Sequence, residues 1–217
     1  MSVNFLTPRF PSFVDTASLK TIRYSLGGSC LFLFILTLLF SPLLAQLVFM
    51  TLWGNLTTLV STFLSLTHSA DSPNCVRSKV VLFLFEFSMC MQVMIVVLYW
   101  TQIHHWLMER IILYSVDHFI QVFIHIIPFL CITASVTFSQ VRFKHSHGKW
   151  IMIISAIFLM INCVATKIMG RILYPFLPWE ELWASIGITI VLVMIVGAVY
   201  WVLCKAVNFW LPKEIKL

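Results

Sequence analysis

The sequence predicts an all-α fold, a polytopic transmembrane helix bundle of about six spans with both termini in the cytoplasm. Of its 217 residues, 60% are hydrophobic and only 10% are charged. A soluble domain carries about 25% charged residues to cover its surface, so this chain is too apolar to be one. Its long uncharged runs suit helices, which need about 20 apolar residues to cross a bilayer core. The runs are continuous rather than alternating, which argues against a membrane β-barrel.

One transmembrane domain over residues 24–211 is expected, between an N-terminal cytoplasmic arm (residues 1–23) and a short cytoplasmic tail (residues 212–217). The domain contains six apolar segments, at residues 24–40, 47–66, 80–101, 116–138, 150–166 and 182–210. We expect the arm to be exposed, because it mixes prolines with charged residues. The first apolar segment starts late and lacks a small-x-small cleavage site, which favours an uncleaved helix over a signal peptide.

Basic residues predict the orientation of these spans. Eleven of the fourteen lysines and arginines lie in the arm, in the loops after the second and fourth segments, and near the C-terminal end. The other side holds only Arg110, Lys167 and Arg171. Because positive charge is retained in the cytoplasm, both ends are expected there, with residues 102–115 and 167–181 outside. The basic residues are scattered rather than arranged in a stripe, so no nucleic-acid partner is expected.

Few polar side chains interrupt the apolar segments, and each is a candidate for function because charged groups cost about 2.5–3.5 kcal/mol to insert into a bilayer. They are Asn55, Glu86, Gln92, Asp117, His118, Gln121, His125 and Asn162. Half of them fall in the segment 116–138. That segment is therefore the first place to look for a site.

Thr51 and His125 form the candidate catalytic pair. Measured from the non-cytoplasmic side at helical rise, Thr51 lies about 6 Å and His125 about 13 Å into the membrane. A threonine hydroxyl becomes a nucleophile when a base takes its proton. Desolvation disfavours the charged imidazolium, which leaves His125 able to act as that base. Pro128 cannot donate to the carbonyl of Ile124, so a protein group or water must satisfy that carbonyl inside the membrane.

Three further residues are candidates for supporting roles. Asn55 lies one helical turn from Thr51 and could donate a hydrogen bond to an oxyanion, while Asp117 or His118 would orient the base. The alternative stays open, because a single histidine in a span is often a packing residue and a single threonine often bonds its own backbone. No cofactor or metal is expected: His104-His105 and His145-x-His147 fall on opposite sides of the membrane and are read as solvated loop histidines.

Four short motifs resemble the androgen-induced-protein family of multi-pass membrane hydrolases. The stretch from Ile124 to Pro128 resembles the family's histidine-containing helix, and Gly170 with Tyr174-Pro175-Phe176-Leu177 resembles its segment after the fifth span. The other two motifs are Phe49-Met50-Thr51 with Asn55-Leu56, and Val97-Leu98-Tyr99-Trp100. The motifs occur in the order of the family and cover most of the chain from residue 47 onward.

The resemblance implies a threonine hydrolase of the endoplasmic reticulum that cleaves fatty-acid esters of hydroxy fatty acids or related lipid esters. Thr51 would be the nucleophile and His125 its partner. The bilayer and the lipid ester would be its partners, and the residues specify no protein partner. The competing hypothesis is a non-enzymatic accessory or structural subunit of a membrane complex. A transporter is disfavoured, because inverted repeats and broken helices in corresponding halves are absent from the sequence.

Overall fold

The computed structural model describes residues 5–40, 48–67, 76–105, 116–170, 173–174, 176–177 and 179–209. These residues form an all-α fold without a β-strand, as predicted. The six long helices are α1 (Thr16–Phe40), α3 (Met50–Leu66), α4 (Val76–Leu98), α6 (Val116–Phe138), α7 (Gly148–Met169) and α8 (Leu182–Phe209). A π-helical turn, η1 (Tyr99–Ile103), continues α4, and a 3-10 turn, η2 (His145–His147), leads into α7.

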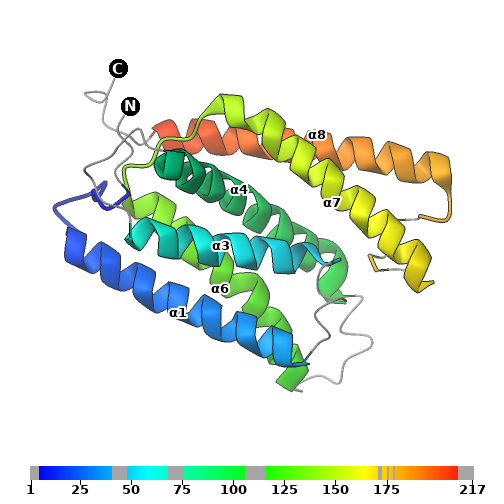
Figure 1. Ribbon diagram of the computed structural model, residues 1–217, viewed down its shortest axis with the longest axis horizontal. Helices are drawn as coiled ribbons and strands as arrows, with labels where there is room; N and C mark the ends of the chain where they lie inside the picture. Colours follow the sequence, from blue (N-terminus) through cyan, green and yellow to red (C-terminus); the bar gives the residue numbers. More distant parts are fainter. Residues whose placement is uncertain are drawn as a thin grey trace.

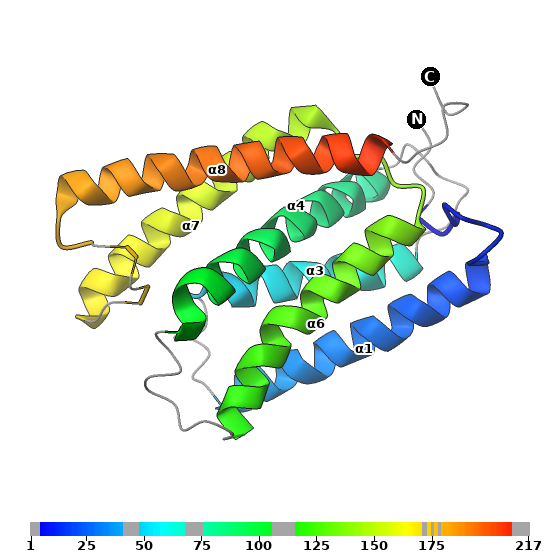
Figure 2. The ribbon, with the colours of Figure 1, turned by 180° about the vertical axis from the view of Figure 1, so that it is seen from behind.

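Successive long helices run in opposite directions, so the start of α1 and the end of α8 lie at the same end of the bundle (Figure 1). Helix α3 is central and packs against α1, α4 and α6. Seen from behind, α6 lies between α1 and α4 (Figure 2). Helices α7 and α8 pack together, and α8 also contacts α4. This arrangement places the N-terminus of α3 close to α6 and α7.

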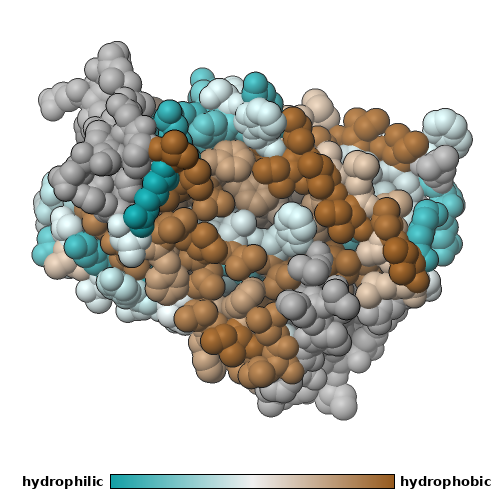
Figure 3. All heavy atoms as spheres, viewed as in Figure 1, coloured by the Kyte–Doolittle hydropathy of each residue, from teal (hydrophilic) through white to brown (hydrophobic). Residues whose placement is uncertain are grey.

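Five helices in the described part of the chain are long and apolar enough to cross a membrane, and they include α1, α4, α6, α7 and α8. Helix α3 has 17 residues and is not among them. It is enclosed by three helices and buries Asn55, Thr58, Ser61 and Thr62, so its polar groups face protein. The apolar surface that could face lipid belongs instead to helices such as α8. In that helix, Trp183 is 82% and Met194 61% exposed. Apolar residues cover much of the face in Figure 3, and hydrophilic residues gather toward the ends of the helices.

The N-terminal arm is exposed only in part: residues 11–13 are exposed as predicted, whereas residues 5–10 pack against the bundle. Phe5 is buried against Phe85, with ring centroids 5.5 Å apart. The Arg9 backbone N–H donates to the carbonyl of Phe138 at 2.8 Å, and Arg9 Nε donates to the carbonyl of Ser139 at 3.1 Å. The last carbonyls of a helix have no partner within it, and the arm supplies donors to those of α6. The sequence suggested exposure because these donors are polar.

Helix α1 begins at Thr16, ahead of the expected start at Tyr24. Asp15 explains this start, because its Oδ1 accepts a hydrogen bond from the Ser18 N–H at 2.6 Å and so caps the helix. The extra turns bring Arg23 into the bundle, where it is fully buried. Its guanidinium lies 5.6 Å from the centre of the Phe85 ring and donates to the Ser135 carbonyl at 3.5 Å. The expected tail over residues 212–217 lies outside the described residues.

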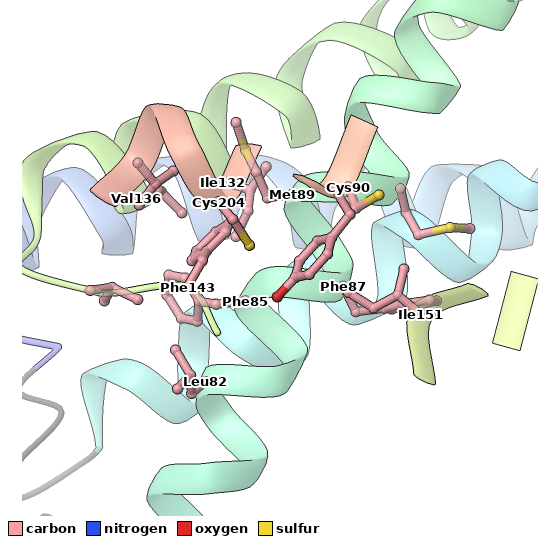
Figure 4. Packing of buried hydrophobic residues seen from close by; sticks show 14 of the residues in the cluster. Leu82, Phe85, Phe87, Met89, Cys90, Ile132, Val136, Phe143, Ile151 and Cys204 are labelled. Carbon is pink, nitrogen blue, oxygen red and sulfur yellow. The ribbon is translucent and has the colours of Figure 1, made fainter. Parts of the chain in front are cut away.

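The main hydrophobic core lies between α4, α6, α7 and α8. Figure 4 shows side chains from these helices and from the loop after α6 packed together, among them Leu82, Phe85, Cys90, Ile132, Phe143, Ile151 and Cys204. Elsewhere α3 and α4 approach closely at Gly54, where an added Cβ would overlap Cδ1 of Ile95. A larger residue here would have to displace the end of the Ile95 side chain, so Gly54 allows α3 to lie close to the polar residues of α4.

A polar cluster ties the loop between α6 and α7 to α4. The carboxylate of Glu86 is fully buried and accepts a hydrogen bond from the Lys144 N–H at 2.6 Å. Its other oxygen pairs with Nδ1 of His147. Tyr200 Oη donates to the Lys144 carbonyl at 2.8 Å. His147 is thus an internal partner of a buried carboxylate, and its expected role as a solvated loop histidine is wrong.

Candidate active site

Helices α3 and α6 bring Thr51 and His125 together. Thr51 is the second residue of α3, and His125 lies near the middle of α6. The Thr51 Oγ1 atom is 3.1 Å from Nε2 of His125. His125 is buried, at 5% exposure, whereas Thr51 is half-buried. The contact between these two side chains, which the depth estimate predicts, is present.

The second nitrogen of His125 determines which way this hydrogen bond runs. His125 Nδ1 lies 2.6 Å from the backbone carbonyl of Gln121, one turn earlier in α6. A carbonyl oxygen can only accept, so Nδ1 carries the proton and Nε2 of the neutral ring is an acceptor. The Thr51 hydroxyl therefore donates to Nε2. This is the direction of proton transfer that a nucleophile and its general base require.

Asn55 satisfies the backbone carbonyl that Pro128 leaves free. Asn55 Nδ2 donates to the Ile124 carbonyl at 3.2 Å, directly beside His125. Asn55 Oδ1 accepts from Gln92 Nε2 at 3.1 Å, and the same Gln92 nitrogen donates to Thr58 Oγ1 at 3.1 Å. The Asn55 amide is thus committed to holding α3 against α6 and α4. This differs from the expected role as an oxyanion donor.

Tyr99 fixes the plane of the His125 ring. The two rings are stacked, with centroids 3.7 Å apart and an interplanar angle of 11°. Tyr99 opens the π-helical turn η1, an irregularity that often occurs at functional sites. Its Oη lies 3.3 Å from Nδ1 of His104, so His104 contributes to the packing around the site rather than standing in solvent as expected.

The groups that orient His125 were not expected from the sequence. The side chains of Asp117 and His118, the expected candidates, lie outside the described residues. The orienting groups found are the Gln121 carbonyl and the Tyr99 ring. A backbone carbonyl gives no sequence signal, and a π-helical turn has no short motif. Gln92, one of the polar residues that the sequence singles out, lies one step further away as the partner of Asn55.

An apolar pocket adjoins the pair at the N-terminus of α3. Its empty space, counted with its open mouth, is about 460 Å³. Side chains from α3, α4, α7, α8 and the segment before α8 line it, among them Met50, Met94, Phe158, Tyr174 and Leu192. Thr51 and His125 do not line the pocket; Met50, the residue before Thr51, does. In the described part of the chain, no three His, Cys, Asp or Glu side chains are grouped so as to hold a metal ion.

Comparisons with protein-family models, curated proteins and solved structures found no match for this chain. The chemical capability of the site follows from its geometry. A hydroxyl donates to an unprotonated imidazole nitrogen, the imidazole is fixed by a carbonyl and a stacked ring, and an apolar pocket opens alongside. Such an arrangement is suited to acyl transfer through a covalent intermediate on Thr51.

Proposed function

We propose that this protein is an intramembrane threonine hydrolase that cleaves lipid carboxylic esters. The observation that carries the proposal is the contact of 3.1 Å between Thr51 Oγ1 and His125 Nε2, with Nδ1 bonded to the Gln121 carbonyl. His125 takes the hydroxyl proton as Thr51 attacks the ester carbonyl carbon. The resulting acyl-enzyme is hydrolysed by water, which His125 activates in turn.

The apolar pocket supports a lipid as the substrate. It offers methionine, leucine and phenylalanine side chains to an acyl chain and begins one residue from the nucleophile. An ester that enters from the bilayer would place its chain in the pocket and its carbonyl beyond Met50, at Thr51. Fatty-acid esters of hydroxy fatty acids, which the family resemblance implies, are the first substrates to test.

The location and topology belong to the same proposal. Six spans with both termini in the cytoplasm follow from the distribution of basic residues, and the endoplasmic reticulum follows from the resemblance. Helix α3 would then be the shortest crossing, shielded from lipid by α1, α4 and α6. In sealed microsomes, whose cytoplasmic face points outward, an external protease should cut a tag at Ser72 and should cut a tag at Glu109 only after permeabilisation; the opposite pattern would reverse the orientation.

Labelling with a long-chain fluorophosphonate tests the function. Thr51 Oγ1 should displace fluoride from phosphorus, and mass spectrometry should find the adduct on Thr51. Thr51→Ser keeps the hydroxyl and should keep labelling and ester cleavage. Thr51→Val keeps the shape and removes the nucleophile, so both signals should fall to background.

Thr57→Val is the matched control. The Thr57 hydroxyl lies on the same helix but donates to the carbonyls of Trp53 and Gly54. This variant should therefore label and cleave like the wild type. A folded Thr51→Val protein that hydrolyses lipid esters at the wild-type rate would falsify the proposal and leave the accessory-subunit hypothesis.

A further inference from the structure

Tyr174 reaches the N-terminus of α3 from the segment between α7 and α8. Its Oη accepts a hydrogen bond from the Met50 backbone N–H at 2.8 Å. Met50 and Thr51 are the first two residues of α3, and the first N–H groups of a helix have no partner within it and point out of its N-terminus. The phenol oxygen therefore lies at the same helix end as the Thr51 N–H and hydroxyl.

Packing and hydrogen bonds fix the Tyr174 ring in this place. Its ring meets Phe49 edge-on with centroids 6.0 Å apart, and Tyr174 is 7% exposed. Asn162 of α7 forms hydrogen bonds to two segments near Tyr174, at Val48 and at Trp179. Its Nδ2 donates to the Val48 carbonyl at 3.1 Å, and its Oδ1 accepts from Trp179 Nε1 at 2.8 Å. The segment carrying Tyr174 is thereby tied to the residues just before α3.

The hydroxyl proton of Tyr174 is available to a substrate. The oxygen accepts from Met50, and in the described part of the chain the phenol proton meets no acceptor. Burial raises the pKa of Tyr174 above its usual range, so the phenol keeps its proton at neutral pH. Tyr174 also lines the apolar pocket together with Met50. The donor therefore lies at the end of α3 that carries Thr51 and beside the pocket.

We propose that Tyr174 is a further catalytic residue: its hydroxyl, together with the Thr51 backbone N–H, forms the oxyanion hole for ester cleavage at Thr51. This inference rests on the proposed hydrolase function and adds the group that stabilises its transition state. A backbone N–H of the nucleophilic residue paired with a second donor is an established way to stabilise a tetrahedral oxyanion. Asn55 is held against α6 and α4 instead, because its Nδ2 donates to the Ile124 carbonyl and its Oδ1 accepts from Gln92.

Ester cleavage proceeds through acylation of Thr51 followed by hydrolysis of the acyl-enzyme. Thr51 Oγ1 bonds to the carbonyl carbon, the hydroxyl proton moves to His125 Nε2, and the carbonyl electron pair moves onto the oxygen that Tyr174 and the Thr51 N–H bind. The carbonyl reforms, the carbon–alkoxy bond breaks, and His125 protonates the leaving alcohol. Water then adds to the acyl carbon, and its proton passes through His125 to Thr51. The products are one acid and one alcohol.

Kinetics of Tyr174→Phe in nanodiscs, with a long-chain p-nitrophenyl ester, test the role. Removing one oxyanion donor lowers kcat by about 10²–10³-fold, and KM should stay within about 3-fold because the ground-state ester does not use the donor. A long-chain trifluoromethyl ketone, which Thr51 converts to a tetrahedral adduct, should bind correspondingly more weakly. A long-chain alkyl ether of equal length should bind unchanged. A purely structural role would affect both ligands alike.

Tyr200→Phe is the matched control, because it removes a buried phenol hydroxyl that donates to the Lys144 carbonyl far from Thr51. It should keep the wild-type kcat.

If Tyr174→Phe does not fold, 3-fluorotyrosine at position 174 keeps the shape and makes the phenol a stronger donor, and acylation should accelerate a few-fold. An unchanged acylation rate, or a wild-type kcat for Tyr174→Phe, overturns the role of Tyr174 while Thr51 labelling still stands. Absence of both hydrolysis and Thr51 labelling in the wild type overturns the proposed function itself.

Discussion

Two imidazoles of this bundle, the buried His125 and the partly exposed His147, have different partners. His125 lies between a backbone carbonyl and a hydroxyl, both uncharged, and its Nε2 remains an acceptor. His147 pairs through Nδ1 with the carboxylate of Glu86, which also accepts from the Lys144 N–H. The first ring is placed to take a proton from Thr51, whereas the second ties the loop before α7 to a buried carboxylate of α4.

The difference shows that the partner, rather than the residue type, decides what a histidine does. The carboxylate of Glu86 holds His147 in a structural contact between the loop and α4. The partners of His125 leave its Nε2 free to accept the Thr51 proton. The two rings also differ in burial, because the His147 side chain is 20% exposed and His125 is 5% exposed. Mutations that remove each set of partners should therefore affect different properties, activity in one half and stability in the other.

The largest expected effect is on activity at the Thr51 pair. Thr51→Ala and His125→Ala should each lower kcat for lipid esters by at least about 10³-fold, and the double variant should be little worse than either, because residues that act as one unit lose their effect together. Steady-state kinetics on purified protein measure this. Additive losses would show that the two side chains act independently, and His147→Ala should retain the kcat of the wild type per folded molecule.

Glu86→Gln should act on stability instead. Glutamine keeps only one acceptor oxygen, so the Lys144 N–H or His147 loses its partner, and each buried group left unsatisfied costs about 1–3 kcal/mol of unfolding free energy. Here the Glu86 carboxylate holds both Lys144 and His147. Denaturant unfolding in detergent, followed by tryptophan fluorescence, measures the change. Unaltered stability together with a lost kcat would remove the contrast between the two histidines.

Asn55→Ala should have the smallest effect, a loss of stability that one further substitution, Pro128→Ala, should partly restore. The change leaves the Ile124 carbonyl and the Gln92 amide without the Asn55 partner, and an unsatisfied buried group costs about 1–3 kcal/mol. Adding Pro128→Ala restores a backbone N–H that can bond to Ile124, so the double variant should recover part of the lost stability. Without any recovery, the Asn55 bond to Ile124 would not be the reason for the loss.

Hydropathy in the sequence was enough to predict the all-α fold and the approximate position of each long helix. Depth along the helices suggested Thr51 and His125 as a candidate pair, but their contact also depends on which helices are neighbours and how they are rotated, which depth does not determine. The stacking of Tyr99 on His125 could not be predicted, since it depends on a π-helical turn and on helix rotation. The burial of Phe5 and Arg9 was missed because their partners lie about 80 and 130 residues away, beyond any local pattern.

The docked N-terminal arm has a consequence for how the protein is made. Arg23 and Arg9 bond to carbonyls near the end of α6, so their partners are synthesised long after α1. Chains are synthesised from the N-terminus, and early segments must wait for later ones. We therefore expect α1 to reach its final position only after α6 has entered the membrane, although α1 is synthesised well before it.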